Sequence, residues 1–262
     1  MPSHLSGSSR ELAVEIMRCP ILAECLGEGG YRLACYDVAL GSGGPHRSNW
    51  VPDPWVGHLT EAPLLFVSSS TAGGWDASGD QSGPNADSED EALLDCEDGA
   101  FDEGQPSGIA EGVYPLDGQG RRGKAVRYWE WALARAAEVL PEPVIPGKGY
   151  ALTEVVHCSS TGEPQVWSAL RTCATRYLER VLAASPAQVV VLVGVVAQSA
   201  FAEHLHLSVP DHLLGPVEVG GRDRLLVSVR HPNSRGGVKS FSGQLTEAQL
   251  AEVRGALAAT PS

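Results

Sequence analysis

The most constraining feature of the sequence is an uninterrupted apolar run, Val189-Val190-Val191-Leu192-Val193. Consecutive β-branched and leucine residues are typical of a strand that is covered on both faces of a parallel sheet. The sequence predicts strands near 63–68, 151–156, 188–194 and 224–229, with helical patterns between them. Such alternation favours right-handed βαβ winding. We therefore predict a single three-layer α/β/α sandwich over residues 1–262, with a central, mainly parallel sheet.

The bulk composition favours a cytoplasmic protein. The 262 residues are 43% hydrophobic, which is enough for one sizeable core. No segment reaches the apolar length of a membrane span, and no signal-peptide pattern opens the chain, so we expect no membrane partner. We also expect a monomer. In the cytoplasm, six cysteines favour metal or cluster binding over disulfides.

The acidic residues are concentrated in one stretch. The net charge is −13, but residues 75–115 contain twelve Asp and Glu and no Lys or Arg, so the remaining chain carries a net charge of only −1. A stretch rich in Gly, Ser and Asp buries little apolar surface. We interpret residues 73–117 as an acidic mobile insertion within the single domain.

Four cysteines from two regions are candidates for one metal site. Two of them lie in MRCPILAEC near the amino terminus, one follows the strand at 151–156, and one lies in the next helical pattern. Four thiolates suit either a zinc ion or an iron–sulfur cluster. Cys35 and Cys96 are interpreted as ordinary thiols. The candidate ligands are Cys19, Cys25, Cys158 and Cys173.

The later cysteine pair carries a family resemblance. The pattern VVHC, a second cysteine, RYLERVL and VVVLVG resembles the iron–sulfur uracil-DNA glycosylases of the family four and five types, over most of the chain from Cys19 to about Lys239. The resemblance implies a uracil-DNA glycosylase-like fold and a [4Fe–4S] cluster on the four cysteines, with zinc as the alternative. It also implies hydrolysis of the N-glycosidic bond in base excision repair, on single-stranded DNA or on a base flipped out of the stack.

The strand near 63–68 leads into the family's first motif. PW.G…APLLFVSSS resembles a strand followed by a turn that carries a catalytic Asn, Asp or Glu. In this chain Ser70 takes that place, flanked by Ser69 and Thr71, which we expect to contact the base. General base catalysis contributes about 10² to 10⁴-fold, and a hydroxyl activates water less well than a carboxylate. We therefore expect slower chemistry.

The second motif also departs from the family. Glu154 stands where the resemblance places an Asn that pairs with the edge of uracil. An ionised Glu only accepts hydrogen bonds, so it would repel O4 of uracil and favour an exocyclic amine such as N4 of cytosine. This predicts altered base specificity. The alternative is that Glu154 points away and pairs with an arginine.

The third motif is His231-Pro232 at the end of the last predicted strand. It resembles a motif whose histidine donates to O2 of the base as negative charge develops. We expect His231 to be catalytic and Asn233 to contact the base. The surrounding loop is basic and predicts DNA contact through Arg230, Arg235 and Lys239.

A second basic cluster lies at the start of the helical pattern at 119–140. It predicts phosphate contact through Arg122 and Arg127. Two other functions stay open. Altered polar positions also fit a catalytically inactive nucleic-acid-binding module of the same fold. A hydrolase with Ser70 as nucleophile and His231 as base is a weaker reading, because no orienting acid is evident.

Overall fold

The computed structural model describes most of the chain. The described residues are 7–26, 29, 33–38, 52–70, 90, 94, 98–105, 108–160, 163–209 and 211–259. The predictions for Thr71 and Cys96 lie outside them.

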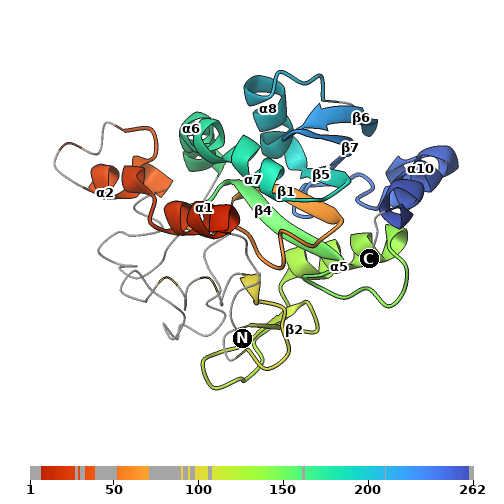
Figure 1. The fold of residues 1–262 in the computed structure, drawn as a ribbon, viewed down its shortest axis with the longest axis horizontal. Helices are drawn as coiled ribbons and strands as arrows, with labels where there is room; N and C mark the ends of the chain where they lie inside the picture. Colours follow the sequence, from red (N-terminus) through yellow and green to blue (C-terminus); the bar gives the residue numbers. More distant parts are fainter. Residues whose placement is uncertain are drawn as a thin grey trace.

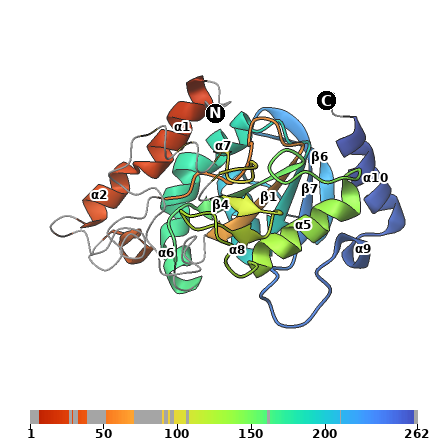
Figure 2. The same ribbon diagram turned by 90° about the horizontal axis from the view of Figure 1, so that it is seen from below.

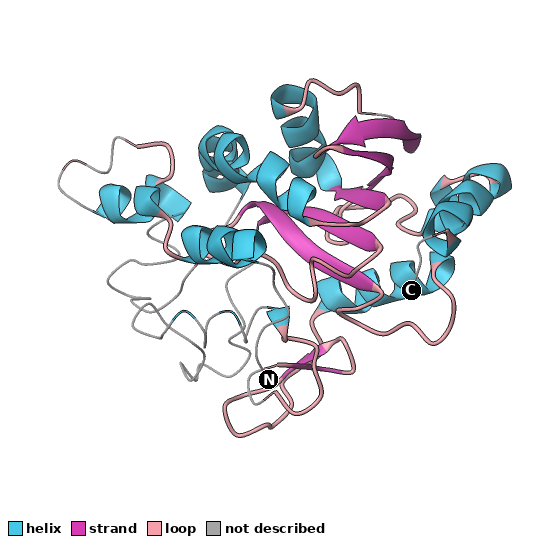
Figure 3. Cartoon of the chain, in the orientation of Figure 1, coloured by secondary structure: helices cyan, strands magenta, loops and turns pink. Residues whose placement is uncertain are grey.

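A five-stranded sheet forms the centre of the molecule (Figures 1 and 3). The strand order is β4-β1-β5-β7-β6, and only the β6–β7 pair is antiparallel. The mainly parallel sheet of the predicted α/β sandwich is confirmed. The strands are β1 (Leu64–Ser70), β4 (Tyr150–Val156), β5 (Val189–Val193), β6 (Leu213–Val219) and β7 (Arg222–Val229).

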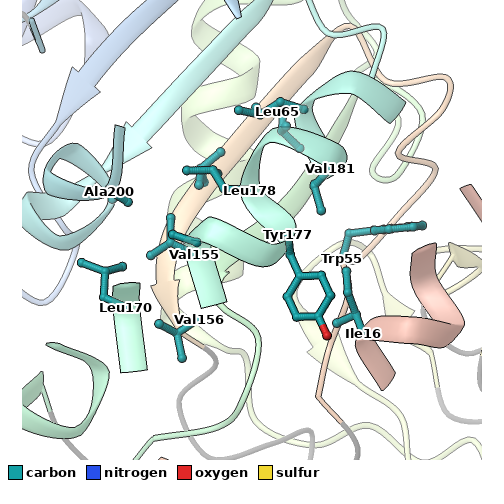
Figure 4. Packing of buried hydrophobic residues seen from close by; sticks show 14 of the residues in the cluster. Ile16, Trp55, Leu65, Val155, Val156, Leu170, Tyr177, Leu178, Val181 and Ala200 are labelled. Atoms are coloured by element: carbon teal, nitrogen blue, oxygen red, sulfur yellow. The ribbon is translucent and has the colours of Figure 1, made fainter. Parts of the chain in front are cut away.

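One face of the sheet packs against the helices that follow β4 and β5. A π-helical segment, Ala174–Leu178, joins α6 to α7. Figure 4 shows residues of this core, including Leu65, Val155 and Tyr177. The helices on this face are α1 (Gly7–Met17), α6 (Glu163–Cys173), α7 (Glu179–Ala184) and α8 (Gly194–His204).

The opposite face carries α5 (Arg127–Val139), α9 (Phe241–Gln244) and α10 (Glu247–Ala258), as Figure 2 shows. Helix α10 begins with a capping box between Thr246 and Gln249. Helix α5 begins at Arg127, later than the pattern at 119–140 predicts. Gly120, which has φ +74°, lies in the loop before it. The two covered faces complete the three layers.

The sequence analysis missed the edge strand β6. It pairs with β7 through a tight turn at Gly220-Gly221, where both residues have positive φ. Only one residue of β6 is buried, so its sequence lacks the apolar run that marks the other strands. A short hairpin, β2 (Ile109–Ala110) and β3 (Tyr114–Pro115), lies outside the main sheet.

The described end of the acidic stretch packs against the rest of the protein. Ala100 and Ile109 are buried in the α5-side core, and Asp98 is buried beside His58. These residues therefore belong to the folded body, whereas the sequence analysis assigned them to a mobile insertion. Trp55, in the segment before β1, is fully buried and fixes this segment to the core.

Candidate functional site

Polar side chains meet at the carboxyl ends of β1, β4 and β7. Ser68 and Glu154 are direct register partners, so their side chains share one face of the sheet. It is the face that also presents Phe66 and Leu152 to α5. Val229 at the end of β7 belongs to the same core, and His231, two residues later, stacks on Tyr128 of α5. Ligands of open α/β sheets bind at this edge.

Glu154 is the buried acid of this group, with 8% of its surface exposed. The Ser68 side chain hydrogen-bonds to its carboxyl group. Among the described residues, its Oε2 atom has no hydrogen-bond partner. Burial, with a smaller contribution from the Asp53 carboxylate, raises the pKa of Glu154 to about 8. Glu154 therefore carries a proton at neutral pH and can donate a hydrogen bond as well as accept one.

Tyr128, the second residue of α5, connects Ser68 to the histidine. Its ring stacks on that of His231, with centroids 6.1 Å apart and planes 15° from parallel. Its hydroxyl lies near Ser68 but makes no hydrogen bond of good geometry within the described part of the chain. Burial raises the pKa of Tyr128, so its hydroxyl keeps its proton. The sequence analysis named neither Tyr128 nor Ser68.

His231 is half-buried directly after β7. Its Nδ1 atom accepts a hydrogen bond from the Asn233 backbone N–H at 3.2 Å, so in the neutral ring the proton is on Nε2. The first residue of α8, Gly194, lies against it with φ +83°. A β-carbon at that position would lie 3.0 Å from the His231 Cβ atom. Glycine thus lets α8 begin beside the imidazole.

The serines at the end of β1 take other positions. Ser70 Oγ lies 2.7 Å from Ser160 Oγ, so its partner is a second hydroxyl rather than a base. Ser69 is half-buried and points, by strand alternation, to the α6 face, away from Ser68. This geometry gives no support to Ser70 as an activated nucleophile.

The predicted DNA-binding residues lie around the same edge. Arg127, Arg230 and Arg235 are exposed. Arg122 is also exposed, but it forms an ion pair with Glu111 at 2.7 Å and lies over the Tyr114 ring. Lys239 Nζ donates to the carbonyl oxygens of Pro232 and Ser234, so it stabilises the conformation of the loop after His231. Asn233 is exposed next to the histidine.

A second site, on the α6 face, contains a pocket lined by four cysteines. The rest of its lining is mainly apolar, including Val156 and Ala169. The Tyr177 hydroxyl donates to the Cys19 sulfur at 3.3 Å, and the His157 backbone N–H lies 3.5 Å from the Cys173 sulfur. The lining cysteines are Cys19, Cys35, Cys158 and Cys173.

Three of the four predicted ligands are therefore brought together, and Cys35 joins them. Cys25 is fully buried in α2 (Pro20–Leu26) but does not line the pocket. Burial raises the pKa of Cys35 to about 11, and charge on Cys25 and Cys19 adds to this shift. Cys35 is not predicted as a ligand from the sequence, because the residues that flank it form no metal-binding motif.

The cysteines that line the pocket can be compared with the ligands that a zinc ion and a [4Fe–4S] cluster require. Within the described ranges, no three His, Cys, Asp or Glu side chains are arranged to hold a single metal ion. A zinc ion draws four sulfurs to about 2.3 Å from one centre. A [4Fe–4S] cluster binds each sulfur to a different iron and keeps the sulfurs farther apart. The four cysteines around this pocket supply the thiolate donors that both metal centres use.

The fold and the two sites define a class of protein. It is an α/β sandwich with a buried polar group at the carboxyl edge of its sheet and a thiol-lined pocket on the opposite face. No protein-family model matches the sequence, and no curated protein matches it. Of the helices that the structure describes, none has the length and apolar character to cross a membrane.

Proposed function

We propose that the protein binds a single unstacked base of DNA and hydrolyses its N-glycosidic bond. The observation that carries this proposal is the group formed by Ser68, Tyr128, Glu154 and His231 at the strand ends. Two of its buried polar atoms, Glu154 Oε2 and Tyr128 Oη, lack good hydrogen bonds within the described residues. Buried polar atoms without partners are costly, and a polar ligand would satisfy both.

The protonation of Glu154 changes the expected base. A protonated carboxyl group donates to a keto oxygen such as O4 of uracil, and its carbonyl oxygen accepts from the adjacent ring N–H. We therefore propose a keto base such as uracil as the substrate, in place of the preference for cytosine expected from an ionised Glu154. Hydrogen-bond complementarity of this kind discriminates strongly in a buried site.

His231 supplies the electrostatic part of the reaction. With Nδ1 occupied by the Asn233 N–H, its Nε2–H can donate to the departing base as negative charge develops there. Water then takes the place of the base on the sugar carbon, and a proton from that water completes the released base. In place of a catalytic carboxylate this chain has Ser70, whose hydroxyl pairs with that of Ser160, so we expect slow turnover.

Phosphate contact and a metal centre are also part of the proposed function. Arg127, Arg230 and Arg235 are exposed around the edge and are suited to phosphate contact, which would make binding salt-dependent. A [4Fe–4S] cluster in the thiol-lined pocket would supply a structural cross-link between the amino-terminal segment and the sheet. Its thiolates would require the reducing conditions of the cytoplasm.

The test is base release from single-stranded oligonucleotides that contain uracil, hypoxanthine or cytosine, followed by alkaline cleavage of abasic sites. We expect release of uracil. We expect His231→Ala to lower the rate by about 10²-fold or more, since removing one such donor typically has this effect. His206→Ala, at an exposed histidine in the loop after α8, is the matched control and should leave the rate unchanged.

Two outcomes would contradict the proposal. Shifted mobility of the oligonucleotides without base release would identify a catalytically inactive nucleic-acid-binding module. Release of cytosine in preference to uracil would show that Glu154 acts in its ionised state.

A further inference from the structure

We propose that Cys35, and not Cys25, supplies the fourth thiolate of the metal centre, together with Cys19, Cys158 and Cys173. This assignment differs from the cysteine pair that the sequence resemblance implies. It rests on the proposed metal centre and is independent of the proposed base excision.

The residues that line the pocket support the assignment of Cys35. Cys35 lines it together with Thr172 and Cys173, which are neighbours at the end of α6. The side chain of Thr172 hydrogen-bonds to the Cys35 sulfur. This contact places the Cys35 sulfur next to Cys173, at the same pocket that Cys19 and Cys158 line. Hydrogen bonds of this kind orient metal ligands.

The position of Cys25 along helix α2 also supports the assignment. Ile21 and Leu22 line the pocket, and Cys25 lies four and three residues beyond them. Residues at this spacing share a face of the helix but lie one turn apart, about 5 Å along its axis. Cys25 therefore lies one turn beyond the part of α2 that lines the pocket, where it is buried without lining it.

Cys25 has a different role in this arrangement. It is fully buried, and its sulfur accepts a hydrogen bond from the backbone N–H of Cys35. It is thus a positioning residue that holds the Cys35 backbone beside the pocket. A serine at position 25 would preserve the acceptor, whereas a serine at position 35 would remove a ligand.

The experiment compares Cys35→Ser with Cys25→Ser in the full-length protein, purified without oxygen. Iron, acid-labile sulfide and zinc are measured per chain, and the visible absorbance spectrum is recorded. We expect wild type and Cys25→Ser to hold equal amounts of metal with the same spectrum. We expect Cys35→Ser to lose most of it, as Cys19→Ser does. Far-UV circular dichroism confirms that each variant is folded.

A measurement on wild-type protein avoids dependence on variant folding. Cysteines are labelled with iodoacetamide and identified by peptide mass spectrometry, first in the metal-loaded protein. The labelling is repeated after the metal has been removed with a chelator and an oxidant and the thiols have been reduced again. We expect Cys35 to be protected only in the metal-loaded protein. Metal loss in Cys25→Ser with full retention in Cys35→Ser would overturn the assignment, and so would wild-type protein that contains neither iron nor zinc. Base release is assayed separately. A protein that releases no base but whose metal depends on Cys35 still supports the assignment of Cys35 as a ligand.

Discussion

At the scale of single residues, the environment of Glu154 decides its chemistry. Burial raises its pKa to about 8 from the ordinary value of 4.5. Between these two values the folded protein keeps the proton and the unfolded chain loses it. The unfolded state then binds fewer protons, so the free energy of unfolding falls as pH rises from about 4.5 to about 8.

Glu154→Gln removes this titration and keeps a donor and an acceptor. We expect the variant to be more stable than wild type near pH 8 and to lack the stability loss that Glu154 causes between about pH 4.5 and 8. Uracil-DNA binding should weaken above pH 8 in wild type and stay constant in the variant. Urea denaturation and fluorescence-anisotropy titrations at several pH values measure these effects. Glu130→Gln, at an exposed position of α5, is the control. A pH profile unchanged by Glu154→Gln would contradict a protonated Glu154.

His58 is a second buried titratable residue, outside the polar group at the sheet edge. Its ring nitrogens lie 3.4 Å from Asp98 and 3.0 Å from Asp102. The hydrogen bond to Asp98 raises the pKa of His58 to about 9, against the opposing effect of burial. Because the folded pKa is the higher one, this contact stabilises the protein fully below pH 6.5 and is lost as pH rises through about 9.

We expect His58→Gln to lower the free energy of unfolding by about 3 kcal/mol at pH 6, since breaking a buried pair leaves a carboxylate without its partner. The difference from wild type should shrink toward pH 10. Thermal unfolding at pH 6, 8 and 10 measures this. His206→Gln, in the loop after α8, is the control. A difference that grows with pH would exclude a charged imidazole in the folded state.

At the scale of secondary-structure elements, one buried arginine joins α7 to the sheet. Arg224 in β7 is 1% exposed. Its guanidinium donates to the carbonyl oxygens of Leu182 at 2.6 Å, Ser185 at 2.8 Å and Val219 at 2.9 Å, and also to that of Ala187. The end of a helix leaves carbonyl groups without partners, and Arg224 donates to that of Leu182 in α7 and to that of the C-cap residue Ser185.

Arg224→Leu should therefore destabilise the protein by about 3 kcal/mol or more, because several buried carbonyl groups lose their donor. Arg224→Lys should recover only part of this, because an ammonium group cannot reach four acceptors in one plane. Arg222→Leu, two residues away on the same strand and exposed, is the matched control and should change stability little. Chemical denaturation gives the three values. Equal effects at positions 222 and 224 would show that the carbonyl contacts carry no stability.

At the scale of the whole molecule, the thiol-lined pocket joins the amino-terminal segment to the sheet. Cys19 precedes α2, while Cys158 and Cys173 belong to the β4–α6 unit. Apolar packing of α1 against α7 and the ion pairs of Glu15 with Arg176 and Arg180 also hold this segment. Exposed ion pairs contribute little, so apolar packing and a bound metal centre would be the main contacts that hold this segment.

Removing the metal should loosen this segment before it affects the sheet. We expect faster hydrogen exchange in residues 7–26 and 33–38 after chelation, with β1 and β5 unchanged. Hydrogen-exchange mass spectrometry of metal-loaded and metal-free protein tests this, and Cys35→Ser should resemble the metal-free state. Uniform loss of protection across the sheet would mean that the metal supports the whole fold.

The sequence by itself determined the parallel sheet, because mainly apolar segments are stable as strands that are buried on both faces. These segments are 63–68, 151–156, 188–194 and 224–229. It also placed Glu154 within a strand and His231 directly after one, since chain order fixes these positions. It could not predict β6, which is mostly exposed and has no apolar run.

Only the tertiary structure decided which side chains meet. Ser68 and Tyr128 join Glu154 through strand register and the position of α5, neither of which is encoded locally. Cys35 lines the pocket and Cys25 does not, because Cys25 lies one helical turn beyond the residues of α2 that line it. The proton on Glu154 depends on burial by residues distant in sequence. Proximity in three dimensions and desolvation are properties of the folded chain, so residue type and spacing alone do not determine them.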